Sequence, residues 1–332
     1  MSKMKCSELL IKGTKRLKEK GIVAPRLEAE VLLAFAWGRE RTHLLIFSDD
    51  LVPEEVEWAF NELLSQRSRG VPVAYLTGEK EFMSLPFYVN QDVLIPRPET
   101  ELLVERVLNF LAGVQGDGLV TEPESKAELP PHSLAVCCQK PKNSFSGKRI
   151  APLSAGGDMQ MPLVADVGTG SGAVAVSLAY YDAGVHLVAT DISPAALQVA
   201  RRNAKRHGVA ERIEFLQGDL LAPLLQQGIT GVGSAVAANL PYIPTADLQG
   251  LPLDVQYEPI DALDGGWDGL DHYRRLLPQA AAFLAPKGLL ACEVGVGQAE
   301  LLAGIFVKEG WTEIDIIKDY AGRERIVTAI HW

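Results

Sequence analysis

The stretch Asp166-Val167-Gly168-Thr169-Gly170-Ser171-Gly172 lies between an apolar run at 163–167 and a helical pattern at 172–181. A strand, an acid, a glycine-rich turn and a helix in this order form the first unit of a Rossmann-like domain. Glycine lets a backbone approach a ligand closely and tolerates positive φ. We therefore expect contacts to a nucleoside-bearing cofactor from Asp166, Gly168, Thr169, Gly170, Ser171 and Gly172.

Two acids downstream extend this prediction. The turn alone is weak support, because it has the spacing G-x-G-x-G and lacks the G-x-G-x-x-G of NAD enzymes. Asp191 ends the second predicted strand, where an acid can accept both ribose hydroxyls; the alternative is an acid that caps the following helix. Asp219 ends the third predicted strand, where it meets either the adenine amino group of the cofactor or only its own turn.

The chain from 161 onward alternates between strand and helix patterns. This alternation predicts an α/β fold with a doubly wound, mostly parallel sheet. The last two strands are closely spaced, which predicts a hairpin that inserts antiparallel to the rest. The predicted strands are 163–167, 186–191, 213–217, 235–239, 288–294, 314–317 and 326–330, and the first two helices of this part are 172–181 and 194–207.

Asn239-Leu240-Pro241-Tyr242 follows the fourth predicted strand, so it faces the same edge of the sheet as the glycine turn. The Asn239 Oδ1 and the Leu240 carbonyl can each accept one N–H of a planar –NH2 group, and an aromatic ring can pack on its flat face. Such a grip orients the nitrogen lone pair for attack on a methyl group. We predict methylation of an amide or exocyclic amine, with Asn239, Pro241 and Tyr242 as catalytic residues and Leu240 in the substrate site. The alternative is a simple turn after the strand.

The remaining sequence divides into segments of different pattern. We predict a helical domain at 1–80, an extended linker or hairpin and a helix at 81–112, a flexible insertion at 113–160, and the catalytic domain at 161–332. Residues from about 71 to 98 have an extended pattern, and Thr100 is a candidate cap for the helix that follows. The insertion is rich in Gly, Pro, Ser and Lys and contains Cys137-Cys138, to which no function is assigned.

Composition limits the classes of function. With 332 residues, 47% of them hydrophobic and 22% charged, the chain fits two domains with a real core. We expect no membrane span and no signal peptide. The net charge of −10 disfavours stable binding of long nucleic acid. The cysteines and histidines lack metal-ligand spacing, so we expect no metal and a reduced, cytoplasmic setting.

At this point the chain resembles the class I methyltransferases that modify the glutamine of peptide chain release factors, the HemK/PrmC family. The resemblance covers most of the chain, and its most specific element is Ile95-Pro96-Arg97-Pro98-Glu99-Thr100-Glu101. General methyltransferases lack this element. Besides the glycine turn and the Asn239 motif, the resemblance is carried by residues 69–78, 82–101, Glu258-Pro259, 262–266 and Asp268-Gly269-Leu270.

The resemblance implies S-adenosylmethionine as methyl donor and N5-methylation of the glutamine in the Gly-Gly-Gln tip of class 1 release factors. It implies cofactor contacts from Gly168–Gly172, Asp191 and Asn239, a grip on the substrate amide by Asn239–Tyr242, and a helical domain that helps to dock the release factor. Leu220 stands where the family often has an aromatic residue beside adenine. The family usually has Asn-Pro-Pro-Tyr, but Leu240 keeps the backbone carbonyl, and a residue before proline stays extended.

Two other functions remain open. Asn-Leu-Pro-Tyr also resembles the adenosine dimethyltransferases of ribosomal RNA, and an adenine-N6 methyltransferase of ribosomal RNA or DNA would present the same –NH2 group. The acidic charge, the helical domain and the stretch from Pro96 to Glu101 weigh against it. A catalytically silent binding module on the same fold is the third possibility. The intact Asp166, glycine turn, Asp191 and Asn239 weigh against that one.

Overall fold

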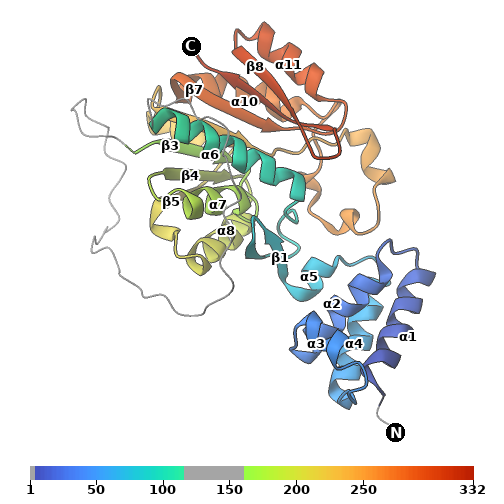
Figure 1. Ribbon diagram of the computed structural model, residues 1–332. Helices are drawn as coiled ribbons and strands as arrows, with labels where there is room; N and C mark the ends of the chain where they lie inside the picture. Colours follow the sequence, from blue (N-terminus) through green and yellow to red (C-terminus); the bar gives the residue numbers. More distant parts are fainter. Residues whose placement is uncertain (1–3, 116–160) are drawn as a thin grey trace.

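The computed structural model describes residues 4–115 and 161–332 of the chain (Figure 1). Helix α6 spans Glu101–Gln115 and so continues into the first three positions of the predicted insertion at 113–160. The rest of that predicted insertion, with Cys137-Cys138, lies outside the described residues. Within the described part, no helix is long and apolar enough to cross a membrane.

The N-terminal part is a bundle of helices, as the sequence predicts. Leucines from α1 and α2 pack with Phe60 of α4 in one buried cluster. Gly13 of α1 faces this ring: an added Cβ would lie 2.6 Å from Phe60 Cζ, so glycine allows α1 to pack close to α4. The helices are α1 (Cys6–Glu19), α2 (Pro25–Trp37), α3 (Arg41–Ile46), α4 (Glu54–Arg67) and α5 (Val73–Thr77).

The prediction of an extended chain from about 71 is wrong at its start, where α5 forms. Pro72 precedes this helix with φ −59°, and Gly78 ends it in the left-handed region with φ 70°. Val73 and Leu76 pack against the helical core, and this packing outweighs the strand propensity of β-branched residues. The hairpin that follows is as predicted: β1 (Glu79–Phe82) pairs antiparallel with β2 (Leu85–Tyr88).

The C-terminal part is built on a seven-stranded sheet in the order β5-β4-β3-β6-β7-β9-β8. Its pairs are parallel from β5 through β7, which confirms the predicted doubly wound sheet. Strand β9 lies between β7 and β8 and pairs antiparallel with both. It is therefore the one strand of this sheet that runs opposite to the other six. The strands are β3 (Leu163–Val167), β4 (His186–Asp191), β5 (Ile213–Gln217), β6 (Gly233–Ala238), β7 (Leu284–Glu293), β8 (Thr312–Lys318) and β9 (Glu324–Ile330).

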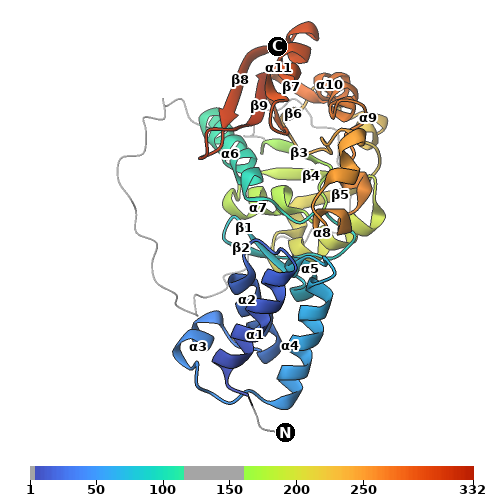
Figure 2. The same ribbon diagram turned by 90° about the vertical axis from the view of Figure 1, so that its right-hand side faces the viewer.

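Helices cover both faces of this sheet and create two buried clusters (Figures 1 and 2). One cluster contains residues of α6, α7 and α8, and the other contains residues of α9, α10 and α11. The helices are α7 (Ala173–Tyr181), α8 (Pro194–Arg206), α9 (Ala222–Gln226), α10 (Asp271–Phe283) and α11 (Ala299–Lys308), with short 3-10 turns at Pro98–Thr100, Ala210–Arg212, Thr245–Gly250, Val255–Tyr257 and Ile260–Ala262.

The helical bundle contacts the segment that follows β6. Arg67 at the end of α4 is buried; its Nε lies 2.6 Å from Glu28 Oε2, and its Nη2 lies 3.4 Å from Asp254 Oδ2. The Tyr257 hydroxyl donates to the Arg69 carbonyl at 3.2 Å. Residues far apart in the sequence therefore join the bundle to the loop that leads away from Asn239-Leu240-Pro241-Tyr242.

Candidate active site

Asp166 organises the glycine turn from inside the protein. Its Oδ2 accepts the Thr169 hydroxyl at 2.6 Å and the Ala175 backbone N–H at 3.0 Å. Burial raises the pKa of Asp166 to about 6, against these two hydrogen bonds, which lower it. The side chains of Asp166, Thr169 and Ser171 are buried. The accessible part of the turn is therefore Gly168, which is exposed, and Gly170, which is partly exposed.

Gly170 borders free space at the middle of the turn. It has φ 53°, and an added Cβ would meet nothing within 4 Å. By contrast, an added Cβ at Gly172 would lie 3.0 Å from Ala200 Cβ, so this glycine serves the packing of α7 against α8. The free space beside Gly170 fits the close approach of a nucleoside-bearing cofactor.

Asp191 lies directly across from this turn. Its Oδ2 accepts the Gly170 N–H at 2.8 Å, and its Oδ1 accepts the Ser193 N–H at 2.9 Å. Ser193, not Asp191, caps α8 with its side chain, which accepts the Ala196 N–H. Burial raises the pKa of Asp191, and the backbone hydrogen bonds oppose that effect. Each carboxylate oxygen keeps a lone pair, which suits a donor such as a ribose hydroxyl.

Asp219 and Leu220 lie after β5 at the same edge of the sheet. Asp219 forms an ion pair with Arg275 of α10, and both side chains are about half exposed. Leu220 has a left-handed φ of 51°, and its side chain joins the core beneath the sheet. Their predicted contacts with adenine remain predictions.

The glycine turn and the Asn239 motif touch each other. An added Cβ at Gly168 would lie 3.0 Å from Leu240 Cδ2 and 4.0 Å from the Asn239 carbonyl oxygen. A cofactor on the turn and a substrate on the motif would therefore be neighbours, as a direct transfer between them requires.

Asn239 is oriented by Thr100. The Asn239 Nδ2 donates to the Thr100 Oγ1 at 3.0 Å, so its Oδ1 is the end left for a substrate N–H. The predicted capping bond of Thr100 to α6 is not found among the hydrogen bonds of the described residues; its hydroxyl accepts from Asn239 instead. The Thr100 hydroxyl also lowers the pKa of the buried Glu293 at the end of β7.

The backbone of Leu240 and Tyr242 is held by side chains of Tyr273 and Gln298. The buried Tyr273 hydroxyl accepts the Leu240 N–H at 3.3 Å and donates to the Glu293 carbonyl. The Tyr242 carbonyl accepts the Gln298 Nε2 at 2.8 Å. Burial raises the pKa of Tyr242 to about 12, so its phenol is neutral and its ring is available for packing.

Glu258 fastens the segment before Thr100. One Glu258 oxygen accepts the Ile95 N–H at 3.0 Å, and the other lies 2.5 Å from Arg97 Nη2. Glu258 is 5% exposed, and burial raises its pKa, whereas Arg97 lowers it. This pair ties two segments that are 161 positions apart to each other beside the site.

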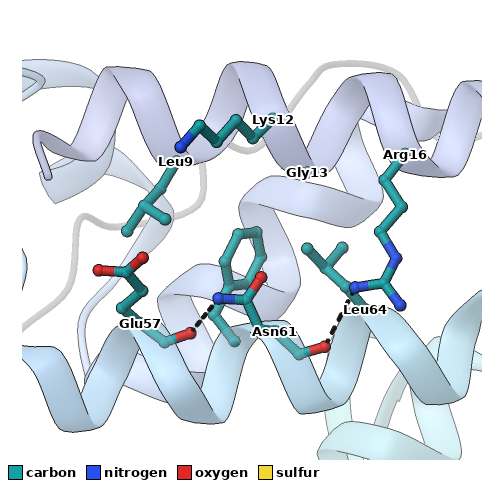
Figure 3. A pocket seen from close by; sticks show the side chains of 8 residues that line it. Leu9, Lys12, Gly13, Arg16, Glu57, Asn61 and Leu64 are labelled. Carbon is teal, nitrogen blue, oxygen red and sulfur yellow. Dashed lines mark hydrogen bonds between the residues drawn. The ribbon is translucent and has the colours of Figure 1, made fainter.

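A separate hollow of about 240 Å³ lies over Gly13 between α1 and α4 (Figure 3). There Arg16 donates to the Asn61 carbonyl, and Asn61 donates to the Glu57 carbonyl, so its polar groups are largely partnered. It contains none of the predicted site residues. Among the residues that the structure describes, no group of three or more His, Cys, Asp or Glu could hold a metal ion.

Comparison with known proteins decides the family. The model of the PrmC N-terminal domain matches residues 8–78, and that of a methyltransferase domain matches residues 164–251. A release factor glutamine methyltransferase from Moorella thermoacetica is 41% identical over 98% of each chain. The chain belongs to the release factor glutamine methyltransferase family. The corresponding enzyme from Geobacter sulfurreducens is 36% identical over 94% of this chain and 91% of that one.

The fold is also shared beyond this family. The catalytic domain of hMettl16, solved with an RNA hairpin, aligns with a TM-score of 0.52 over 82% of each chain at 11% identity. The methyltransferase fold, the helical N-terminal domain and the use of S-adenosylmethionine are thus confirmed for a member of the release factor glutamine methyltransferase family.

Sequence reasoning gave no role in the site to Glu293 or Tyr273. A signal for Glu293 was present, because an acid at the end of the buried strand β7 has the same placement as Asp191 at the end of β4. Tyr273 lies within an ordinary helical pattern, and its hydroxyl reaches Leu240 only through the packing of α10.

Proposed function

We propose that this protein transfers a methyl group from S-adenosylmethionine to the side-chain amide N5 of the glutamine in the Gly-Gly-Gln motif of class 1 release factors. The observation that carries the proposal is the contact between the two motifs: Gly168 of the glycine turn lies against Leu240 of the substrate motif. Membership of the family gives the release factor as substrate.

The roles of the residues follow from their donors and acceptors. Asn239 Oδ1 and the Leu240 carbonyl each accept one N–H of the glutamine amide, and the Tyr242 ring packs on its flat face. These acceptors stabilise the positive charge that develops on nitrogen during attack. S-adenosylmethionine supplies the electrophilic methyl group: the new N–C bond forms as the S–C bond breaks, and the nitrogen releases one proton to solvent.

The cofactor site is formed by the turn and the acid that faces it. The backbone around Gly170 would border the nucleoside, and Asp191 would accept the ribose hydroxyls with the lone pairs left by its two backbone bonds. We propose that Asp219 and Leu220, which follow β5 at the same sheet edge, contact the adenine. Asp166 supports the turn from beneath it.

The partner and the compartment follow from the same chemistry. We expect the helical domain to help dock the release factor, because Arg67 and Arg69 join it to the loop after the substrate motif. A net charge of −10 disfavours a stable complex with nucleic acid. We also propose that the enzyme meets its substrate in a reduced, cytoplasmic setting.

Labelled S-adenosylmethionine tests this function when a release factor and ribosomal RNA are offered together. The proposal expects label on the release factor and none on the RNA. A release factor in which the Gly-Gly-Gln glutamine is replaced by alanine serves as the matched control and should stay unlabelled. Label on RNA adenine would instead support the adenine-N6 methyltransferase.

A further inference from the structure

Asn239 directly after β6, Thr100 before α6 and Glu293 at the end of β7 form a chain of polar side chains. Ala238 pairs with Cys292 in the parallel ladder, so the next residues, Asn239 and Glu293, are neighbours at the sheet edge. Thr100 Oγ1 accepts from Asn239 Nδ2 at 3.0 Å, and the Thr100 hydroxyl lies close enough to the Glu293 carboxylate to lower its pKa. Both Thr100 and Glu293 are buried, with 3% and 1% of their surface exposed.

This chain can have only one direction while Glu293 is ionised. A carboxylate accepts and cannot donate, so the single Thr100 proton goes to Glu293. Toward Asn239 the Thr100 oxygen can then act only as an acceptor. The Asn239 amide must therefore present its donor, Nδ2, to Thr100. The Oδ1 is consequently directed to the other side, where an –NH2 substrate needs an acceptor.

We propose that Thr100 and Glu293 are positioning residues that hold the Asn239 amide with its Oδ1 toward the substrate nitrogen. This inference rests on the proposed function, since it deepens the role of Asn239 in the same site. A protonated Glu293 could instead donate a hydrogen bond to Thr100. The Thr100 hydroxyl would then donate to Asn239, so the direction of both hydrogen bonds would be reversed. The Asn239 amide would then turn its Nδ2 toward the substrate. The Nδ2 donor and the substrate –NH2 donor would face each other without an acceptor between them.

The buried environment makes this reversal accessible near neutral pH. Burial raises the pKa of Glu293 to about 7, and the neighbouring Thr100 hydroxyl opposes this rise. Glu293 Oε2 has no hydrogen-bond partner among the described residues, which fits a carboxylate that is incompletely solvated. The charged and titratable groups that face it are Glu99, which raises this pKa, Arg97 and Arg325, which lower it, and the buried phenols Tyr242 and Tyr273.

The sign of the pH effect follows directly. Above the pKa the carboxylate fixes Asn239 in the productive orientation, and as pH falls through about 7 that orientation is lost. With both substrates below their KM values, the rate reports the free enzyme. The wild-type rate should therefore decline on the acid side with a midpoint set by Glu293.

Three substitutions distinguish a positioning role from a purely structural one. Thr100→Val keeps the shape and removes the hydroxyl, and it should lower kcat about tenfold to a hundredfold with unchanged cofactor affinity. It should also abolish the acid decline, because Glu293 no longer reaches Asn239. Thr100→Ser is the matched control and should retain both rate and decline. Glu99→Gln should move the decline to lower pH by removing a neighbouring negative charge.

A spectroscopic readout in the free protein completes the test. With 13C-labelled glutamate, NMR should show a higher pKa for Glu293 in Thr100→Val than in Thr100→Ser. An unchanged Glu293 pKa, a wild-type rate in Thr100→Val, or an unaltered acid decline in that variant would overturn the inference. Absence of wild-type turnover on a release factor would contradict the proposed function instead, and the NMR titration would still decide whether the chain exists.

Discussion

Asp191 at the end of β4 accepts the backbone N–H of Gly170 at 2.8 Å from its Oδ2, although the two residues belong to different β-α units. One carboxylate thus shapes the glycine turn and faces the space beside it. Because Ser193 caps α8, Asp191 is not needed for that role. The arrangement links the conformation of the turn to the acid that we assign to the ribose.

Asp191→Asn should weaken binding of S-adenosylmethionine about tenfold to a hundredfold, because a charge-assisted acceptor is lost. Isothermal titration calorimetry measures this affinity. Asp315→Asn, at an exposed acid on β8, is the matched control and should leave it unchanged. Equal affinities of Asp191→Asn and the wild type would show that the ribose assignment is wrong.

Asn239→Ala should reduce kcat at least about a hundredfold, because the positioned acceptor for the amide N–H is gone. The affinity for S-adenosylmethionine should stay within about tenfold, since the turn and Asp191 remain. Asn61→Ala on α4 removes an exposed asparagine away from the site and should leave the rate intact. A normal kcat for Asn239→Ala would contradict the proposed grip on the substrate.

Gly265→Ala tests the support of the substrate motif. An added Cβ would lie 2.7 Å from Tyr242 Cα, so the Tyr242 backbone has to shift. Displacement of about an ångström in a positioning residue can cost about a hundredfold in rate. Gly250→Ala is the matched control, because an added Cβ there meets nothing within 4 Å. Steady-state kinetics would refute the prediction by showing the same kcat for both variants.

Arg97→Ala should destabilise the protein by about 1–3 kcal/mol near neutral pH, because it leaves the Glu258 carboxylate buried without its counter-charge. The pKa of Glu258 is raised by burial and lowered by Arg97, so the substitution raises it further. The destabilisation should shrink as pH falls and Glu258 becomes protonated.

Urea unfolding at several pH values measures this effect. Arg69→Ala is the control, since the Arg69 side chain is 65% exposed and lies 4.0 Å from Glu62. A destabilisation by Arg97→Ala that is the same at acid and neutral pH would argue against a role for the Glu258 charge.

Much of the catalytic domain could be predicted from local patterns. The strands at 163–167, 186–191 and 213–217 agree with the structure in their bounds, because each is a short run between clear turns. The order of the final strands could not be derived so fully. Insertion of β9 between β7 and β8 depends on long-range pairing, and their spacing alone indicates only a hairpin.

The site itself was predicted only at its sheet edge. Glycines and acids after strands reveal Gly170 and Asp191, because topology brings strand ends together. Thr100, which orients Asn239, could not be identified in this way, because it does not follow a strand in the sequence. Thr100 looks like a helix cap in the sequence, and only the packing of α6 over the sheet brings its hydroxyl to Asn239. Helix α5 was missed because five residues are too few for a period to be evident.

The central claim is tested most directly by the mass of the Gly-Gly-Gln peptide from a class 1 release factor incubated with this enzyme and S-adenosylmethionine. We predict one added methyl group, located by fragmentation on the glutamine side chain, with the wild-type enzyme and none with Asn239→Ala. An unmodified glutamine peptide from the wild-type reaction, together with methylated adenine in ribosomal RNA offered in parallel, would contradict it.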